Sequence, residues 1–239
     1  MSLAALLALG ACSDQIHLGT DSRYWFADHE TGNLSQWAEG PASDQIVSAD
    51  AQLTVVNSPT HSGRFAVRSA IYAATRTSYA RLYRSGVLPN DAYFRVWMYI
   101  PQRYTIGLYW NVFEFQGRTD PANPSSYVYL WSLDLQASSG DMSWYLFDDQ
   151  RAVQYNPTVT TVAPIGRWFL VEAFMHQATD NTGRVTFWID GNPLVDVTGV
   201  STVPTMWLSW NVGGSASNIT QQPAEIFLDD AAIARTRSE

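Results

Sequence analysis

Polar and aromatic side chains recur on short strand-like segments of this chain, at spacings that place several of them on one side of a sheet. Every second residue of a β-strand points the same way. Indole and phenol faces cover the apolar side of a pyranose ring, and planar polar groups bind its hydroxyls. We therefore predict a saccharide-binding groove. Its predicted binding residues are Trp97, Tyr99, Trp110, Glu114, Asp134 and Glu172.

One reaction that such a groove can support is β-elimination next to a uronate carboxyl group. It needs a group that neutralises the carboxylate and a base that removes the neighbouring proton. Arg95 or Gln116 can neutralise the carboxylate. His176, Tyr99 or Tyr129 can act as the base. We predict that the catalytic residues are Arg95, Gln116, Tyr129 and His176.

Glycoside hydrolysis is the second reaction to consider. It needs two carboxyl groups, which lie about 5 Å apart in retaining enzymes and farther apart in inverting ones. Glu114 with Asp134 or Glu172 can supply such a pair. The segment 113–116 contains only one acid, so hydrolysis is less favoured than elimination.

Carboxylates near both ends of the chain predict a metal site. Asp28 and Glu30 precede a glycine turn near the start, and Asp229 lies in an apolar run near the end. If the first and last strands pair, these three residues can share one hard cation such as Ca²⁺, which binds six to eight oxygen ligands. Asp229 and Asp230 point to opposite faces of a strand, so only one of them can reach the ion.

The elements that must position these residues are short strands. No segment shows sustained helical periodicity, and aromatic and β-branched runs alternate with Gly, Pro, Asn, Asp and Ser. About a dozen such runs predict an all-β antiparallel sandwich of two large sheets. The predicted strands are Gln52–Asn57, Arg64–Ala70, Ala80–Tyr83, Ala92–Ile100, Leu108–Gln116, Tyr127–Gln136, Met142–Phe147, Trp168–Gln177, Arg184–Ile189, Leu194–Val197, Met206–Val212 and Glu225–Ala234.

Strict alternation assigns faces within these strands. On one strand it places Trp110, Glu114 and Gln116 on the same face. On the next strand along the chain, Asp134 shares a face with Leu130. Which strands are neighbours does not follow from alternation.

The charge of the chain restricts its partners. It has 14 Lys and Arg against 22 Asp and Glu, a net charge of −8. Phosphate binding needs clustered cations, so nucleic acid is excluded as the main partner. Every basic residue is arginine, whose planar fork binds a carboxylate at two points. An anionic ligand requires a local basic patch, for which Arg81 and Arg95 are candidates.

The second half of the chain contains three motifs in a characteristic order. They are a strand that opens on Trp168, a Gly-x-Val-x-x-Trp-x-Asp-Gly hairpin at 183–191, and a final strand with Asp229-Asp230. This order resembles the concanavalin A-like lectin/glucanase superfamily, and within it the heparin-lyase and glucuronan-lyase types of polysaccharide lyase. The resemblance spans roughly residues 24–234. It implies a jelly roll, a structural calcium ion and a polysaccharide partner.

The resemblance does not transfer catalytic residues. The R-x-E-x-R motif of alginate lyases is missing, as is the E-x-D-x-x-E strand of the glucanases, and Q-I-H occurs only at 15–17, outside the predicted strands. Two alternatives to a lyase therefore stay open, because a fold does not fix a function. They are a non-catalytic carbohydrate-binding module and a laminin-G-like adhesion protein.

The start of the chain resembles the end of a bacterial lipoprotein signal. Cys12 is the only cysteine, which excludes an intrachain disulfide, and it follows an apolar run too short to span a membrane. We expect a signal segment at 1–12, a tether at 13–22 and a single jelly-roll domain at 23–239. The protein is then exported. It is held at a bacterial outer membrane or cell surface by lipid on Cys12, or lies in the periplasm or outside the cell.

Overall fold

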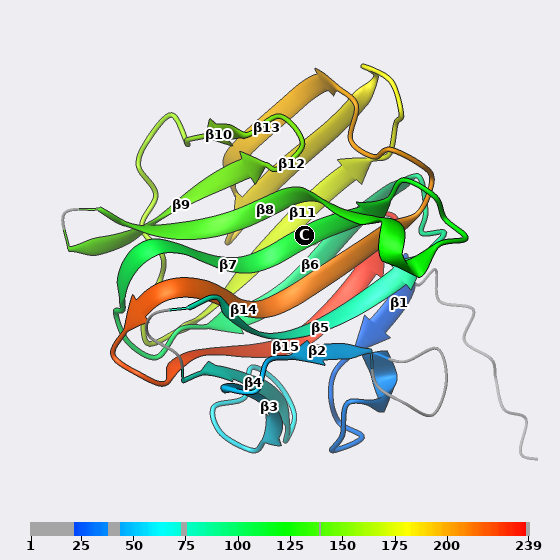
Figure 1. Ribbon diagram of the computed structural model, residues 1–239. Coiled ribbons are helices and arrows are strands. Elements are labelled where there is room, and N and C mark those ends of the chain that lie inside the picture. Colours follow the sequence, from blue (N-terminus) through cyan, green and yellow to red (C-terminus); the bar gives the residue numbers. More distant parts are fainter. Residues whose placement is uncertain (1–21, 38–43, 73–75, 139, 238–239) are drawn as a thin grey trace, which may run out of the picture.

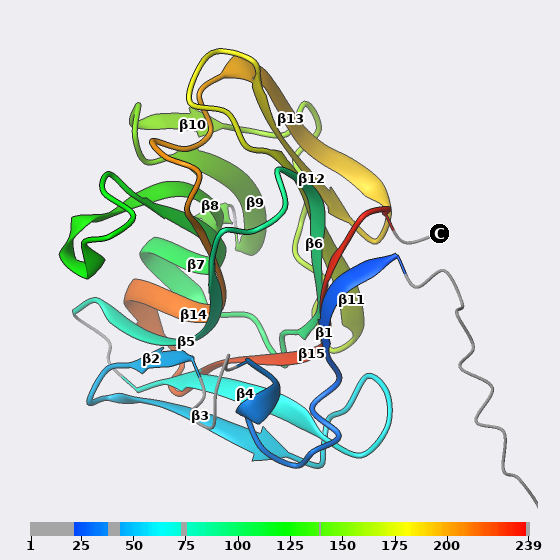
Figure 2. The same ribbon diagram turned by 90° about the vertical axis from the view of Figure 1, so that its right-hand side faces the viewer.

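Two antiparallel sheets stack face to face across an apolar core (Figure 1). The computed structural model describes residues 22–37, 44–72, 76–138 and 140–237. Figure 2 shows the two sheets from the side, with β3 and β4 of the first sheet at the bottom. The all-β sandwich expected from the strand pattern is confirmed.

We call the first sheet the back sheet. Its strand order is β13-β12-β11-β6-β15-β4-β3, and β1 pairs with β15. Its strands are β1 (Arg23–Ala27), β3 (Ala51–Val56), β4 (Ala66–Ile71), β6 (Asp91–Tyr99), β11 (Trp168–His176), β12 (Gly183–Ile189), β13 (Asn192–Val200) and β15 (Ala224–Ala234). The pairing of β1 with β15 joins the two ends of the described chain, which is the pairing that the predicted calcium site requires.

We call the second sheet the cavity sheet. Its strand order is β10-β9-β8-β7-β14-β5-β2. Its strands are β2 (Gln45–Val47), β5 (Ser78–Gly86), β7 (Thr105–Arg118), β8 (Tyr127–Ser138), β9 (Asp141–Asp148), β10 (Val153–Tyr155) and β14 (Leu208–Thr220). Two short 3₁₀ helices, η1 (Ser35–Trp37) and η2 (Pro124–Ser126), complete the described elements.

Aromatic side chains from both sheets interlock in the core. Phe94 of the back sheet packs edge-on against Phe115 of the cavity sheet, with ring centroids 4.9 Å apart. Phe187 of the back sheet packs in the same way against Phe113, at 5.3 Å. All four rings are fully buried. Edge-to-face pairs add to the stabilisation that burial provides, so this cluster fixes one sheet on the other.

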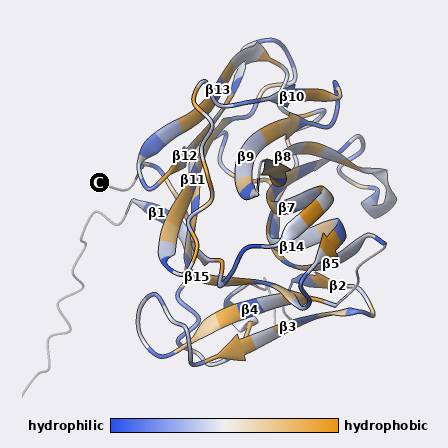
Figure 3. Ribbon diagram, turned by 90° about the vertical axis from the view of Figure 1, so that its left-hand side faces the viewer, coloured by the Kyte–Doolittle hydropathy of each residue, from blue (hydrophilic) through white to orange (hydrophobic). Residues whose placement is uncertain are grey.

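Apolar and polar residues follow one another along many of the strands (Figure 3), as a half-buried sheet requires. The predicted hairpin is confirmed where β12 meets β13. Asp190 and Gly191 have φ angles of 49° and 74°, the left-handed values that a two-residue hairpin turn needs.

A β-bulge in β7 overrides strict alternation. Asn111 pairs with Asp134 and Phe113 pairs with Leu133, so Val112 is an extra residue in β7. Val112 and Phe113 are both fully buried. Because of the extra residue, Trp110 points into the core, where it is fully buried, while Glu114 points outward. The prediction that Trp110 shares a face with Glu114 is wrong.

A second bulge reverses the faces of β8. Phe115 pairs with Trp131 and Gln116 pairs with Tyr129, which makes Leu130 the extra residue. Leu130 and Trp131 are both buried in the core. Tyr129 therefore lies on the same outward face as Asp134, although alternation places Asp134 with Leu130 instead.

The predictions for the start of the chain concern residues that the structure does not describe. The signal segment 1–12, with Cys12, and all of the tether 13–22 except Ser22 lie outside the described residues. Among the described residues, no helix is long and apolar enough to cross a membrane.

Candidate active site

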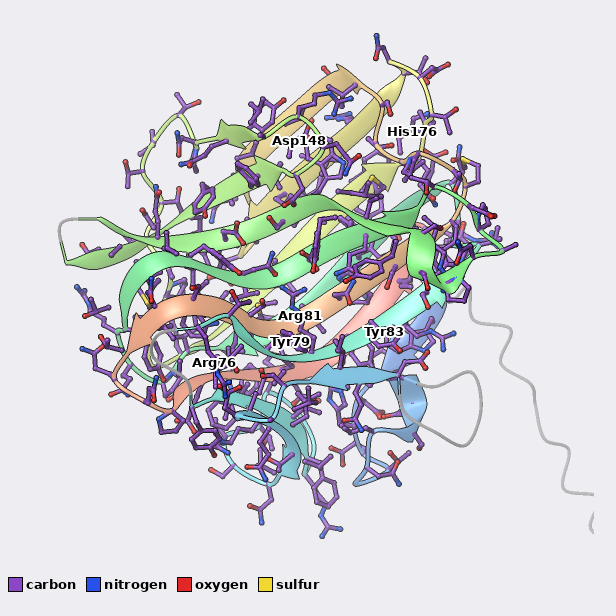
Figure 4. The ribbon with its side chains drawn as sticks, in the orientation of Figure 1. Arg76, Tyr79, Arg81, Tyr83, Asp148 and His176 are labelled. Atoms are coloured by element: carbon purple, nitrogen blue, oxygen red, sulfur yellow. The ribbon has the colours of Figure 1, made fainter. Side chains whose placement is uncertain are left out.

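The outer face of the cavity sheet is hollowed into a cavity of about 600 Å³. Side chains from β2, β5, β7, β8, β9, β10 and β14 line it. Figure 4 labels Tyr79 and Arg81 on β5, the strand between β14 and the edge strand β2. The charged and amide side chains that line the cavity are Arg81, Asn111, Glu114, Gln116, Asp134, Asp149 and Gln154. Its tyrosines are Tyr79, Tyr109, Tyr127, Tyr129 and Tyr145.

A buried ion pair forms the centre of the cavity floor. Nη1 of Arg81 donates to Oε2 of Glu114, and both side chains are almost completely buried. Gln116 Nε2 donates to the same oxygen over 2.6 Å. Burial raises the pKa of Glu114, while the charge of Arg81 opposes this rise. Arg81 Nε is buried and has no hydrogen-bond partner among the described residues.

A second acidic pair lies beside this floor. Ser132 Oγ lies 3.2 Å from Oδ2 of Asp134 and 3.3 Å from Oδ2 of Asp149. Burial and then the charge of Asp149 raise the pKa of Asp134 to about 7. Burial and then the charge of Glu114 raise the pKa of Asp149 to about 6. These carboxyl groups exchange protons near neutral pH, which suits general acid–base catalysis.

Two buried acceptors on neighbouring strands have no donor. Asp134 Oδ1 and Asn111 Oδ1 are both buried without a hydrogen-bond partner in the described part of the chain. The two residues are paired in the register of β7 and β8. Buried polar atoms rarely stay unpaired. Hydroxyl groups of a bound sugar are donors of the kind that these two oxygens require.

Tyrosine hydroxyls surround these groups. Tyr129 lies opposite Gln116 in the sheet and is 46% exposed. Burial, followed by its hydrogen bond with Tyr127, raises the pKa of Tyr129 to about 12. Burial and the neighbouring charge of Asp134 also raise the pKa of Tyr145. Both hydroxyls therefore hold their protons at neutral pH and can donate them.

The structure brings together four of the ten residues predicted for catalysis and binding. Gln116, Tyr129, Glu114 and Asp134 all line the cavity. Arg81 was predicted only as a candidate for a basic patch, and Asn111, Tyr145 and Asp149 were not predicted to belong to the site. The alternation Tyr79, Arg81, Tyr83 on β5 is the signal that was available for Arg81.

The back sheet holds the other predicted residues apart from Trp110. Arg95, Trp97 and Tyr99 are on β6, and Glu172 and His176 are on β11. Their neighbours along β6 and β11, such as Val96 and Val171, are fully buried between the sheets. The predicted set therefore does not converge on one face, because its strands belong to different sheets.

Local contacts occupy these back-sheet residues. His176 Nδ1 lies 2.8 Å from Oδ1 of Asp91. The Trp97 ring stacks on the His61 ring, with centroids 3.8 Å apart. Arg95 and Glu172 are opposite each other in the pairing of β6 with β11. The core lies between this face and the cavity.

The predicted calcium ligands are bound to different protein donors. Asp229 is fully buried, and its Oδ2 accepts from the backbone nitrogen of His61 over 2.9 Å. Glu30 Oε1 accepts from the backbone nitrogen of Arg64 over 2.8 Å, and Asp28 Oδ1 from Gln36 Nε2 over 2.8 Å. Within the described residues, no three His, Cys, Asp or Glu side chains are grouped to hold a metal. Calcium binding at these three carboxylates stays a prediction.

Solved structures share this architecture. An endo-β-1,4-glucuronan lyase from the fungus Trichoderma reesei superposes with a TM-score of 0.65 at 15% identity, covering 90% of this chain and 96% of that one. The cellulose-induced protein Cip1 gives 0.56 at 16% identity, covering 89% and 98%. An alginate lyase from Aplysia kurodai gives 0.54 at 14% identity, covering 88% and 98%. At these identities the likeness concerns the fold, which is the jelly roll that the sequence motifs implied.

The sequence itself gives a family assignment. No curated protein matches the chain. The family model described as polysaccharide lyase matches residues 29–232, a span that contains all the cavity residues named above. The resemblance inferred from the sequence motifs is therefore confirmed. This chain belongs to the polysaccharide lyase family.

Proposed function

We propose that the protein cleaves a uronate-containing polysaccharide by β-elimination in the cavity of the cavity sheet. One observation carries the proposal. A single cavity brings a buried arginine, an amide, two carboxyl groups with raised pKa values and several protonated tyrosines together. These are the groups that neutralisation of a carboxylate and transfer of two protons require.

Arg81 and Gln116 are the groups best suited to bind the uronate carboxylate. Elimination removes the proton next to that carboxylate, so negative charge spreads onto the carboxylate in the transition state. Arg81 brings a positive charge to the lining of the cavity, and Gln116 has a second amide proton besides the one that Glu114 accepts. Donors fixed in a partly buried site stabilise such charge more strongly than water does.

Asp149 and Tyr129 are the proposed proton-transfer groups. With a pKa of about 6, Asp149 is mostly ionised at neutral pH and is only partly buried, as a base must be. It takes the proton from C5 of the uronate, the C4–O bond breaks, and a C4–C5 double bond forms. Tyr129, with its pKa of about 12, gives its proton to the departing oxygen. This assigns Tyr129 the acid role, where the sequence suggested a base.

Related structures support uronate as the substrate class. Two of the folds that superpose on this chain belong to a glucuronan lyase and an alginate lyase. Asp134 contributes in the same direction, because a carboxyl group with a pKa of about 7 can donate a hydrogen bond to a substrate carboxylate instead of repelling it.

The test is turnover on defined polyuronates. Purified protein is offered glucuronan, alginate and heparin, and the unsaturated product is followed by its ultraviolet absorbance. The proposal expects absorbance to rise on at least one polymer, and the rise to be lost when Gln116 is changed to Ala. Glycan binding with no unsaturated product on any polymer overturns the lyase and leaves a binding module.

Export and lipid attachment at Cys12 are a separate proposal, supported by the apolar run before this cysteine. Labelling of cells with a fatty-acid analogue, compared between the natural chain and Cys12→Ser, tests it. The calcium ion at Asp28, Glu30 and Asp229 also stays a proposal, and no step of the reaction depends on it.

A further inference from the structure

A second, smaller pocket of about 300 Å³ lies beside the main cavity. The two share Gln154, which lines both. On β8 and β9, the pair Gln136 and Ser143 follows the pair Asp134 and Tyr145. Two residues of strand span about 7 Å, so the pocket begins roughly one sugar residue away from the acidic pair. We call it the amide pocket.

The amide pocket differs chemically from the main cavity, because none of the described residues that line it is charged. Its polar side chains are Gln136, Ser143, Gln154, Asn156 and Thr160. Gln154 Nε2 donates to Asn156 Oδ1 over 2.7 Å and lies 3.5 Å from Gln136 Oε1. This arrangement leaves an amide donor on Gln136, another on Asn156 and an acceptor on Gln154.

The wall of the amide pocket is fixed in place. The loop that contains Asn156, Pro157 and Thr160 continues into residues 161–163, which lie along β9. The backbone nitrogen of Trp144 donates to Thr161 O over 3.0 Å, and that of Ala163 donates to Met142 O over 2.8 Å. A wall held by backbone hydrogen bonds is formed before a ligand arrives, which lowers the cost of binding.

Uncharged donors and acceptors that alternate in a preformed pocket match the hydroxyl groups of a neutral sugar. A uronate there finds no cation, and its desolvated charge stays uncompensated. We propose that the amide pocket binds an uncharged sugar residue next to the uronate that is cleaved. The substrate is then a mixed polysaccharide in which uronate and neutral sugar are neighbours. This inference rests on the proposed function and specifies its substrate class.

The test compares two hexasaccharides of equal length. One is an alternating glucuronate and N-acetylglucosamine chain made from hyaluronan, and the other is a glucuronate homopolymer made from glucuronan. We expect kcat/KM to favour the alternating chain by at least about tenfold, the size expected from a few neutral hydrogen bonds. Equal values, or a preference for the homopolymer, overturn the proposal.

Variants of the amide pocket test whether the preference for the alternating hexasaccharide arises there. The double variant Q136A/N156A removes two amides and is expected to lower kcat/KM for the alternating chain about tenfold, with little change for the homopolymer. N181A removes an exposed amide in the turn before β12 and serves as the matched control. An equal loss on both hexasaccharides, or no loss on either, contradicts the assignment.

Binding separates this inference from the proposed reaction. If neither hexasaccharide yields unsaturated product, the lyase proposal fails. Calorimetric titration of both hexasaccharides then tests whether the amide pocket binds a neutral sugar. Tighter binding of the alternating chain, lost in Q136A/N156A, supports the neutral-sugar site. Equal binding, or none, overturns it.

Discussion

Gln116 lies directly opposite Tyr129 in the antiparallel pairing of β7 with β8, and both side chains line the cavity. Gln116 is the amide that hydrogen-bonds to Glu114. Tyr129, together with Tyr127, is more exposed than the other tyrosines of the site. This relationship gives the proposed carboxylate-binding group and the proposed acid one fixed geometry on a rigid sheet.

Removal of the Tyr129 hydroxyl tests the acid role. We expect Tyr129→Phe to lower kcat by about 10² to 10⁴, the range for loss of a general acid or base, with an unchanged melting temperature. The matched control is Tyr24→Phe, because Tyr24 is 45% exposed on the back sheet, against 46% for Tyr129. Similar kcat values for both variants contradict the role of Tyr129.

The Arg81–Glu114 pair makes a prediction about stability. Arg81→Met leaves Glu114 buried without its cation, and loss of one partner of a buried pair costs about 3–5 kcal/mol. The double variant Arg81→Met with Glu114→Gln removes the stranded charge, so we expect it to be more stable than the single one. Urea unfolding measures both. A double variant less stable than Arg81→Met means that Glu114 is stabilised by other groups.

Asp134 predicts how stability depends on pH. Its carboxyl has a pKa of about 7 when folded against an ordinary value of 3.8, so the folded state holds the proton more tightly. The contribution of Asp134 to the free energy of unfolding is therefore fully present below pH 3.8 and is lost as the pH rises to about 7.

The matching variant is Asp134→Asn, which cannot ionise. We expect it to flatten the fall in unfolding free energy between about pH 4 and pH 7. Asp120→Asn, at an exposed turn residue, is expected to leave that fall intact. The measurement is urea unfolding at several pH values, and an unaltered slope in Asp134→Asn refutes the assignment.

His176 offers a direct comparison between the two sheets. It was predicted to be catalytic, yet it is bound to Asp91 on the back sheet. We expect His176→Gln to keep full turnover while Gln116→Ala loses it. Loss of turnover in a folded His176→Gln protein places the reaction on the back sheet instead.

The calcium proposal is tested by chelation. A bound ion stabilises the folded state by mass action, so EDTA is expected to lower Tm and added calcium to restore it. The variant Asp28→Asn with Glu30→Gln should no longer respond to the chelator. An unchanged Tm of the natural chain in EDTA removes the proposal.

The strand pattern predicted the sandwich, because period-two alternation and turn residues are local properties of the sequence. The hairpin at Asp190-Gly191 follows from the same kind of signal. The faces of β7 and β8 did not follow, because the extra residues Val112 and Leu130 look like ordinary apolar strand residues.

The membership of the site was predictable only in part. Gln116 and Glu114 lie two apart on one strand, and alternation alone places them together. Local sequence favours Arg95 and His176 as site residues just as strongly, because it does not show which sheet a strand will join. Strand order is decided by pairings between segments far apart in the chain, such as β14 with β5 and β7.

The bulges at Val112 and Leu130 shift the alternation of side chains by one residue for the rest of the strand. Each exchanges the set of side chains that reaches the cavity for the set that reaches the core, and strand order is untouched. Insertion or deletion of one residue at such a point changes which side chains of half the strand face the cavity. Relatives with the same strands but different bulges are therefore expected to present different active-site side chains from equivalent positions.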